Sequence, residues 1–284
     1  MKDLADIDLP SELKIDSLER NLLGETKDIF FCVGEFDGRP VSAYIKISKH
    51  PQLSLSNERA VLAALAPTSL PVPIVLWYGG ERNDVLIVEA MAGRMIWDYI
   101  DPRRVRYDGD KAIAYLHSYG ECLARIHGLH MSWPPQKRPW LHGLIGEEGL
   151  ADERFKRLVS WVRTNDSVSP ERVFVHGDFN TASVLFDNDS VSGVVDWEFA
   201  GTGWREYDLA WALRARISFL NTRPERDAIL NGYCTRASYD ENALQFCEVL
   251  NYLHFAYWSR ESKPAYTSFA LDLAMGIAGL EPIS

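Results

Sequence analysis

The sequence predicts an α+β protein with two lobes. Between residues 18 and 88 the apolar residues form short runs separated by turn residues, which is typical of β-strands. After Gly93 the apolar residues recur at the spacing of helices, and a strand-rich part followed by a helical part indicates the α+β class. The chain has 284 residues, which is long enough for two lobes with separate cores, although the length alone would also permit one large domain.

The composition is that of an ordinary globular protein, with 46% hydrophobic and 25% charged residues. No apolar run reaches the roughly eighteen residues that a membrane-spanning helix needs, and the acidic start does not look like a secretion signal. The four cysteines are scattered without a C-x-x-C pair, so we expect reduced thiols. These features predict a cytoplasmic protein with no membrane partner.

The formal net charge of −10 narrows the choice of partner. A protein that binds nucleic acid needs basic patches to contact phosphates, so no nucleic-acid partner is expected. The charge is compatible with a small cationic substrate, although many proteins are acidic for solubility alone.

The first lobe is predicted to contain a hairpin. Residues 29–33 and 41–47 are apolar runs, and Asp37-Gly38 between them is a strong signal for a tight turn. Lys46 alternates with the apolar Ile45 and Ile47, so its side chain is expected on the opposite face of the second strand.

A helix and two more strands are expected next. Apolar residues at helical spacing predict the helix over residues 57–65, with Glu58 near its start. Residues 70–77 and 85–88 have the character of strands, and a short connector at 89–93 leads into the helical part.

The stretch 173–198 is the best clue to function. An apolar run ends at His176-Gly177-Asp178, and residues 184–186 and 191–195 then form a predicted hairpin that ends at Asp196. Two carboxylates on neighbouring strand ends could hold a divalent ion and a reacting hydroxyl group at once.

The rest of the second lobe is expected to be helical. A flexible loop is predicted at 197–203, and the predicted helices span residues 153–164, 225–237, 240–258 and 265–279.

The segment H-G-D-F-N-T-A-S at 176–183, the hydrophobic hairpin and V-V-D-W-E at 194–198 resemble the catalytic segment of the aminoglycoside phosphotransferase and choline kinase family. This resemblance implies a two-lobed protein-kinase-like fold, with a small antiparallel β-sheet and one helix in the first lobe and a larger, mainly helical second lobe. It implies a nucleotide-binding lobe over residues 1–88, a hinge at 89–93, and a catalytic and acceptor-binding lobe over 94–284.

The resemblance also implies roles for individual residues. Asp178 meets the attacking hydroxyl as the catalytic base, and Asp196 holds the magnesium that bridges the nucleotide phosphates. Lys46 reaches the α and β phosphates, and Glu58 pairs with it. The remaining implied nucleotide contacts are Gly24 and Thr26 in a phosphate loop, and Glu89 and Met91 in the hinge.

Three further polar residues are expected to be structural. By the same resemblance, His176 braces the catalytic loop and Asp208 ties to the backbone of that loop. The spacing of Ile113, Leu116, Leu123 and Ile126 predicts a helix, and His127 at its end is expected to be satisfied by packing or by the helix dipole.

The chain departs from the family pattern at Ser183, where the pattern has the asparagine that helps to bind the metal. Three interpretations remain open. Ser183 binds magnesium directly or through water, Asn180 helps from another angle, or the metal site is impaired. We favour a retained but weakened site, because the other elements of the pattern are intact.

The predicted function is the transfer of the γ-phosphate of ATP or GTP, with Mg²⁺, to a hydroxyl of a small and cationic acceptor. An aminoglycoside or another antibiotic is the expected acceptor, which implies a role in resistance. The protein is expected to be a monomer or a homodimer. The alternatives are a metabolic kinase for a choline-like amine, homoserine or a sugar, and a catalytically impaired nucleotide-binding relative. A metal-dependent hydrolase that uses His176 is disfavoured, since such sites need more histidine ligands.

Overall fold

The computed structural model describes residues 7–21, 27–49, 54–80, 84–100, 109–135, 151–165, 168, 170–214 and 223–281. The predicted phosphate-loop residues Gly24 and Thr26 lie outside this part of the chain. The chain divides into two units, which comprise residues Met1–Tyr107 with Ala182–Ala200, and Asp108–Thr181 with Gly201–Ser284.

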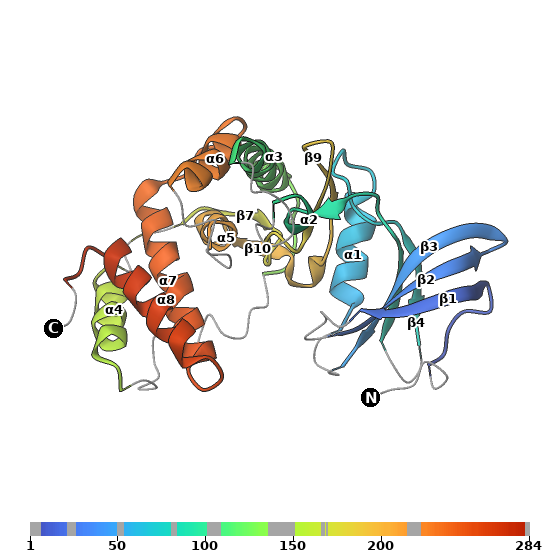
Figure 1. The fold of residues 1–284 in the computed structure, drawn as a ribbon, viewed down its shortest axis with the longest axis horizontal. Coiled ribbons are helices and arrows are strands. Elements are labelled where there is room, and N and C mark those ends of the chain that lie inside the picture. The colour runs from blue at the N-terminus through green and yellow to red at the C-terminus, as the bar shows by residue number, and fades with distance from the viewer. Residues whose placement is uncertain are drawn as a thin grey trace. The chain divides into compact units, whose positions relative to one another are not determined.

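The first unit contains the predicted antiparallel sheet (Figure 1). Its five strands lie in the order β1-β2-β3-β5-β4, and every neighbouring pair is antiparallel. The strands are β1 (Leu13–Asn21), β2 (Lys27–Phe36), β3 (Arg39–Ser48), β4 (Val75–Gly79) and β5 (Val85–Glu89). The strand predicted over residues 70–77 begins only at Val75, since Pro71 and Pro73 cannot donate to a ladder.

The tight turn at Asp37-Gly38 sets the register of β2 and β3. Both residues have positive φ, at 53° and 74°, which is the backbone that a two-residue hairpin turn of type I′ requires. The turn makes Phe36 face Arg39 and aligns the remaining pairs along the two strands. Alternate side chains on one face then build a buried apolar core that includes Ile45 and Ile47.

Helix α1 (Ser56–Leu65) packs against β4 and against the 3₁₀ turn η2 (Trp197–Phe199). The backbone N–H of Leu55, just before α1, donates to the Asp84 carboxylate, which satisfies one of the free donors at a helix start. The unit is completed by α2 (Trp97–Ile100) and a second sheet of β6 (Arg94–Met95), β8 (Val184–Asp187) and β9 (Ser190–Val194). The predicted hairpin at 184–195 is therefore confirmed.

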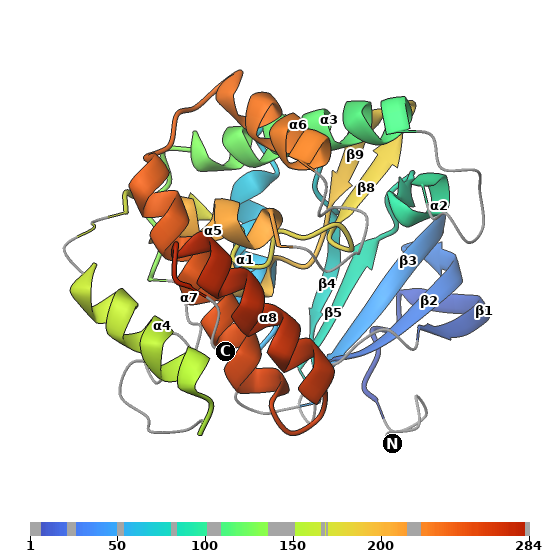
Figure 2. The ribbon, with the colours of Figure 1, turned by 60° about the vertical axis from the view of Figure 1, so that its left-hand side comes forward.

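The second unit is mainly helical, as predicted. Helices α3 and α6 pack together, and α4 lies against both α7 and α8 (Figure 2). The helices are α3 (Gly109–His127), α4 (Glu153–Thr164), α5 (Arg205–Ala212), α6 (Arg223–Cys234), α7 (Glu241–Ser259) and α8 (Pro264–Ile277).

The prediction of a flexible loop at residues 197–203 is wrong. Residues Trp197–Phe199 form η2, and β10 (Gly201–Trp204) pairs antiparallel with β7 (Arg172–Val175). Glycine-rich sequence carries little strand signal, so the partner strand rather than local preference decides this element.

The division into units differs from the predicted lobes. The first unit runs to Tyr107 and includes the hairpin of β8 and β9, whereas the sequence placed the boundary at residue 88. Pairing of β8 with β6, and a hydrogen bond from the N–H of Val194 to Pro71 at 2.8 Å, attach the hairpin to the first unit. The predicted functional boundaries at 88 and 93 stay a prediction.

Two glycines test the packing of the helices. Replacing Gly232 in α6 by alanine should lower the free energy of unfolding by about 1–3 kcal/mol, because the new Cβ would lie 2.0 Å from the carbonyl oxygen of His117 in α3. Gly276→Ala in α8 is the matched control, since its Cβ meets no atom within 4 Å and should raise stability by roughly 0.4–1 kcal/mol. Thermal unfolding measures both, and equal effects would contradict the close approach of α3 and α6.

Candidate active site

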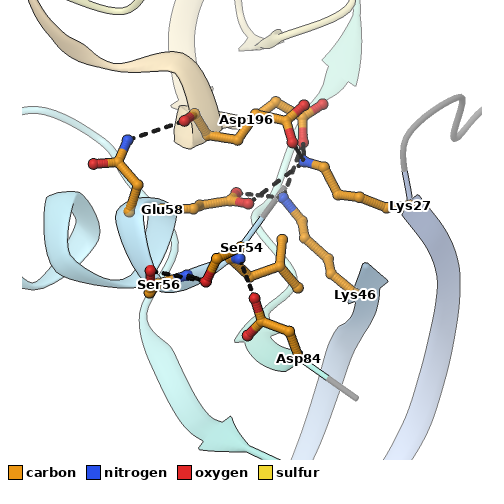
Figure 3. A network of polar contacts seen from close by, with 10 residues as sticks. Lys27, Lys46, Ser54, Ser56, Glu58, Asp84 and Asp196 are labelled. Carbon is orange, nitrogen blue, oxygen red and sulfur yellow. Dashed lines mark hydrogen bonds and ion pairs between the residues drawn. The ribbon is translucent and has the colours of Figure 1, made fainter. Parts of the chain in front are cut away.

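A buried ion pair links β3 to α1 in the first unit (Figure 3). The Nζ of Lys46 donates to the Oε1 of Glu58 at 2.5 Å, and both side chains are almost fully buried. Strand alternation turns Lys46 away from its apolar neighbours, and the first turn of α1 directs Glu58 toward it. The structure thus contains the pair expected from the sequence.

Asp196 joins this pair from the end of β9. Its Oδ1 accepts a hydrogen bond from Lys46 at 2.9 Å, and its side chain keeps 37% of its surface exposed. Its backbone is left-handed, with φ of 64° and ψ of 56°, a conformation that is uncommon for residues other than glycine. The indole of Trp197, which donates to the carbonyl of Val194 at 2.9 Å, helps to fix the turn.

Lys27, to which the sequence analysis assigned no role, is part of the same cluster. Its Nζ lies 3.2 Å from Asp196 Oδ1, 3.3 Å from Glu198 Oε2 and 3.5 Å from Glu58 Oε2. The signal for it was present in the turn at Asp37-Gly38, because that register pairs Lys46 with Ile29. A residue two positions from Ile29 lies on the same face of the sheet, so the register directs Lys27 toward Lys46.

The cluster keeps its members charged. Burial lowers the pKa of Lys27 and of Lys46, but the nearby carboxylates outweigh this and raise both pKa values above the ordinary lysine value. Burial raises the pKa of Glu58 and of Asp196, but the two lysines outweigh this and lower both. Burial raises the pKa of Glu198 above its usual range. Two ammonium groups and the Glu58 and Asp196 carboxylates are therefore ionised at neutral pH.

The predicted catalytic loop follows β7 in the second unit, and Asp208 in α5 holds its backbone. The Asp208 carboxylate accepts from the N–H groups of His176 and Gly177, each at 3.0 Å. The Nε2 of His127 lies 3.3 Å from the same carboxylate, and its Nδ1 lies 2.8 Å from the hydroxyl of Tyr233. The structural roles expected for these residues agree with this buried network.

Asp178 itself has a partner that the sequence analysis missed. The indole Nε1 of Trp211 donates to Asp178 Oδ1 at 2.7 Å, and Trp211 is 6% exposed. The amide of Asn180 donates to the backbone carbonyl of Asp178 at 3.0 Å, and the N–H of Asp178 donates to His176 Nδ1 at 3.2 Å. No sequence pattern pointed to Trp211, which lies one helical turn after Asp208.

Of the predicted hinge residues, Glu89 is the last residue of β5 and Met91 lies two residues beyond it. The N–H of Glu89 donates to the carbonyl of Ile74 at 2.9 Å, and the N–H of Ala90 donates to Ser42 at 2.8 Å. Further along, the hydroxyl of Ser192 donates to the carbonyl of Ala92 at 2.9 Å. These bonds fix the connector to the sheet and to β9.

The residues around Asp196 fit a magnesium ion that has few protein ligands. Mg²⁺ takes one or two carboxylates and keeps several waters, and the partly exposed carboxylate of Asp196 suits this need. The described part of the chain contains no group of three or more histidine, cysteine or acidic residues arranged for a metal. Ser183 is buried, and its carbonyl accepts from the N–H of Val195 at 2.9 Å, so the hairpin brings it next to the residue before Asp196.

A protein-family model described as the phosphotransferase enzyme family matches residues 33–246. The chain belongs to this family. As a member of it, the protein is a kinase that acts on a hydroxyl group.

The chain is similar to two curated proteins, one of which is named a phosphotransferase. The chain is 27% identical over 218 residues to aminoglycoside 3'-phosphotransferase of Niallia circulans. The match covers 69% of the present chain and 77% of the relative. The chain is 24% identical over 308 residues to probable acyl-CoA dehydrogenase IBR3 of Arabidopsis thaliana, covering 94% of this chain but 36% of that longer protein.

The fold also matches solved structures. A thermostable mutant of aminoglycoside phosphotransferase APH(4)-Ia, in ternary complex with AMP-PNP and hygromycin B, has a TM-score of 0.71 and 18% identity, over 94% of each chain. The predicted kinase-like fold of the phosphotransferase is therefore confirmed. Among its described helices, we find none with the length and apolar character needed to cross a membrane.

Asp208→Asn tests how the catalytic loop is held. The neutral amide replaces a carboxylate that accepts two backbone N–H groups, so we expect a loss of about 2–3 kcal/mol in the free energy of unfolding, measured by urea denaturation. Asp227→Asn in α6, whose side chain is 54% exposed, should change it by less than about 0.5 kcal/mol. Equal stability of the two variants would contradict the role of Asp208.

Proposed function

We propose that this phosphotransferase moves the γ-phosphate of ATP or GTP to a hydroxyl group of a small cationic acceptor, with Mg²⁺. The observation that carries the proposal is the buried cluster of Lys46, Glu58 and Asp196. Phosphoryl transfer requires positioned charges around the phosphates more than covalent chemistry, and this cluster holds a cation and a partly exposed carboxylate in fixed positions.

In this proposal Lys46 contacts the α and β phosphates, and Glu58 keeps its ammonium group pointed at them. The hinge residues Glu89 and Met91 contact the base of the nucleotide through their backbone. Gly24 and Thr26 would contact the phosphates. Exposed salt-bridge partners would be too mobile for this task, whereas Lys46 and Glu58 are both buried and close to each other.

Asp196 would hold the Mg²⁺, which when bound neutralises charge on the β and γ phosphates. We propose Ser183 as a weaker second ligand, through its hydroxyl group or a water. The open alternative is Asn180, whose amide nitrogen donates to the backbone of the catalytic loop and whose side-chain oxygen would be the metal ligand.

Asp178 would accept the proton of the acceptor hydroxyl. Its Oδ1 receives the hydrogen bond from Trp211, which orients the carboxylate. The network through Asp208 and His176 would keep the loop from moving during transfer.

The acceptor class rests on the relatives and on charge. The relative from Niallia circulans is an aminoglycoside phosphotransferase, and the matched solved structure contains hygromycin B. We propose aminoglycosides or other cationic antibiotics as acceptors, with resistance as the role, and the net charge of −10 is compatible with such compounds.

The test is nucleotide consumption by the purified protein with Mg²⁺, using ATP and GTP separately. Acceptors would be aminoglycosides, other cationic antibiotics, choline, homoserine and sugars, and we expect an aminoglycoside to stimulate turnover. Turnover with only a metabolic alcohol would contradict the antibiotic acceptor but keep the kinase. Nucleotide binding with no turnover on any acceptor would contradict catalysis.

Two substitutions separate the proposed roles of the aspartates. Asp178→Ala should lower kcat by about 10²–10⁴-fold while nucleotide binding stays intact, because it removes only the proton acceptor. Asp196→Ala should abolish the Mg²⁺-dependent part of nucleotide binding, measured by calorimetry with and without Mg²⁺. Asp187→Ala, at the exposed end of β8, is the control and should change neither. Full turnover by Asp178→Ala would overturn its assignment as the base.

A further inference from the structure

Lys27 is a buried cation for which the proposed mechanism has no role. It is the first residue of β2 and is only 4% exposed, although most lysines lie at the surface. Desolvating a lysine is costly, so a buried one needs anions close by. The three carboxylates within 3.5 Å of Lys27 provide them.

The Glu58 and Asp196 carboxylates do not need Lys27 as their first partner. Lys46 already contacts Glu58 at 2.5 Å and Asp196 at 2.9 Å, and Lys27 shares with Lys46 the same oxygen of Asp196. Figure 3 shows the two lysine side chains converging on Glu58 and Asp196 from neighbouring strands. Two ammonium groups on one carboxylate oxygen repel each other, so a further anion near that point would be favourable.

Two ammonium groups that share one carboxylate oxygen suit an anion that arrives together with a cation. A divalent ion on Asp196 would lie beside both ammonium groups, which would leave the cluster with excess positive charge. The nucleotide phosphates are the anions that accompany such an ion in phosphoryl transfer. Lys27 is held less closely than Lys46, because Glu58 lies 3.5 Å from Lys27 and 2.5 Å from Lys46, so Lys27 gives up a weaker contact when it moves to a phosphate.

We propose that Lys27 is a second phosphate-contacting lysine of the donor site. Without nucleotide it neutralises Asp196, and when the nucleotide and its metal bind it exchanges the Asp196 carboxylate for a phosphate oxygen. This inference rests on the proposed function and deepens it, since it makes affinity depend on the number of phosphates more strongly than Lys46 alone would.

The test compares the affinities of adenosine, AMP, ADP and ATP, with Mg²⁺, for the wild-type protein and for Lys27→Met, by isothermal titration calorimetry. We expect the substitution to lower the affinity for ADP and for ATP by at least about tenfold. This ratio corresponds to the loss of one charge-assisted hydrogen bond. Adenosine should bind within about twofold of wild type, because it has no phosphate for Lys27 to contact. Lys14→Met is the matched control, since Lys14 is a 75% exposed lysine on β1.

A second variant protects the test against misfolding. The double variant Lys27→Met/Glu198→Gln removes one positive and one negative group, so the net charge of the cluster does not change. This variant should show the same selective loss of affinity for ADP and ATP.

Each other outcome has a definite meaning. Wild-type affinity of both variants for ATP and ADP would overturn the proposal. An equal loss of affinity for adenosine and for ATP would assign Lys27 a structural role only. That result would also overturn the proposal. If the wild-type protein binds neither ATP nor GTP, the proposed function is wrong and this inference falls with it. If the wild type binds ATP and the variants lose no selectivity for phosphates, only this inference is wrong.

Discussion

The structure of the first unit depends on burying opposite charges next to one another. Lys27, Lys46 and Glu58 are each at most 5% exposed, and any one of them without its partners would cost several kcal/mol. The register of β2 and β3, the position of α1 and the turn at Asp196 must therefore all be correct at once. The closely paired Lys46 and Glu58 keep their charges in fixed positions, which is the condition for electrostatic catalysis.

In the second unit, a buried carboxylate is stabilised by backbone N–H groups instead of by charged side chains. Asp208 accepts from two N–H groups of the catalytic loop and lies beside His127, so one buried carboxylate defines the conformation of the loop. Trp211 on the same helix then fixes the carboxylate of Asp178. In both units a residue far from the chemistry in sequence controls the orientation of a proposed catalytic group.

Much of the fold followed from local signals. The Asp37-Gly38 turn, the hairpin that ends at Asp196, and the helices at 57–65 and 153–164 were predicted because turn chemistry and apolar periodicity act over a few residues. The pairing of Lys46 with Glu58 came from a family resemblance. The strand at 201–204 was missed, because its glycines favour no strand and its partner β7 lies far away in sequence.

The sequence alone determined the fold class, the positions of most elements and the identity of the residues that bear charge, since these depend on local preferences and on recognisable motifs. Only the tertiary structure decided that Lys27 shares an oxygen of Asp196 with Lys46, and that Trp211 donates to Asp178. The physical reason is distance along the chain. Lys27 and Asp196 are separated by 169 residues, and a contact between them exists only once strands and helix have packed.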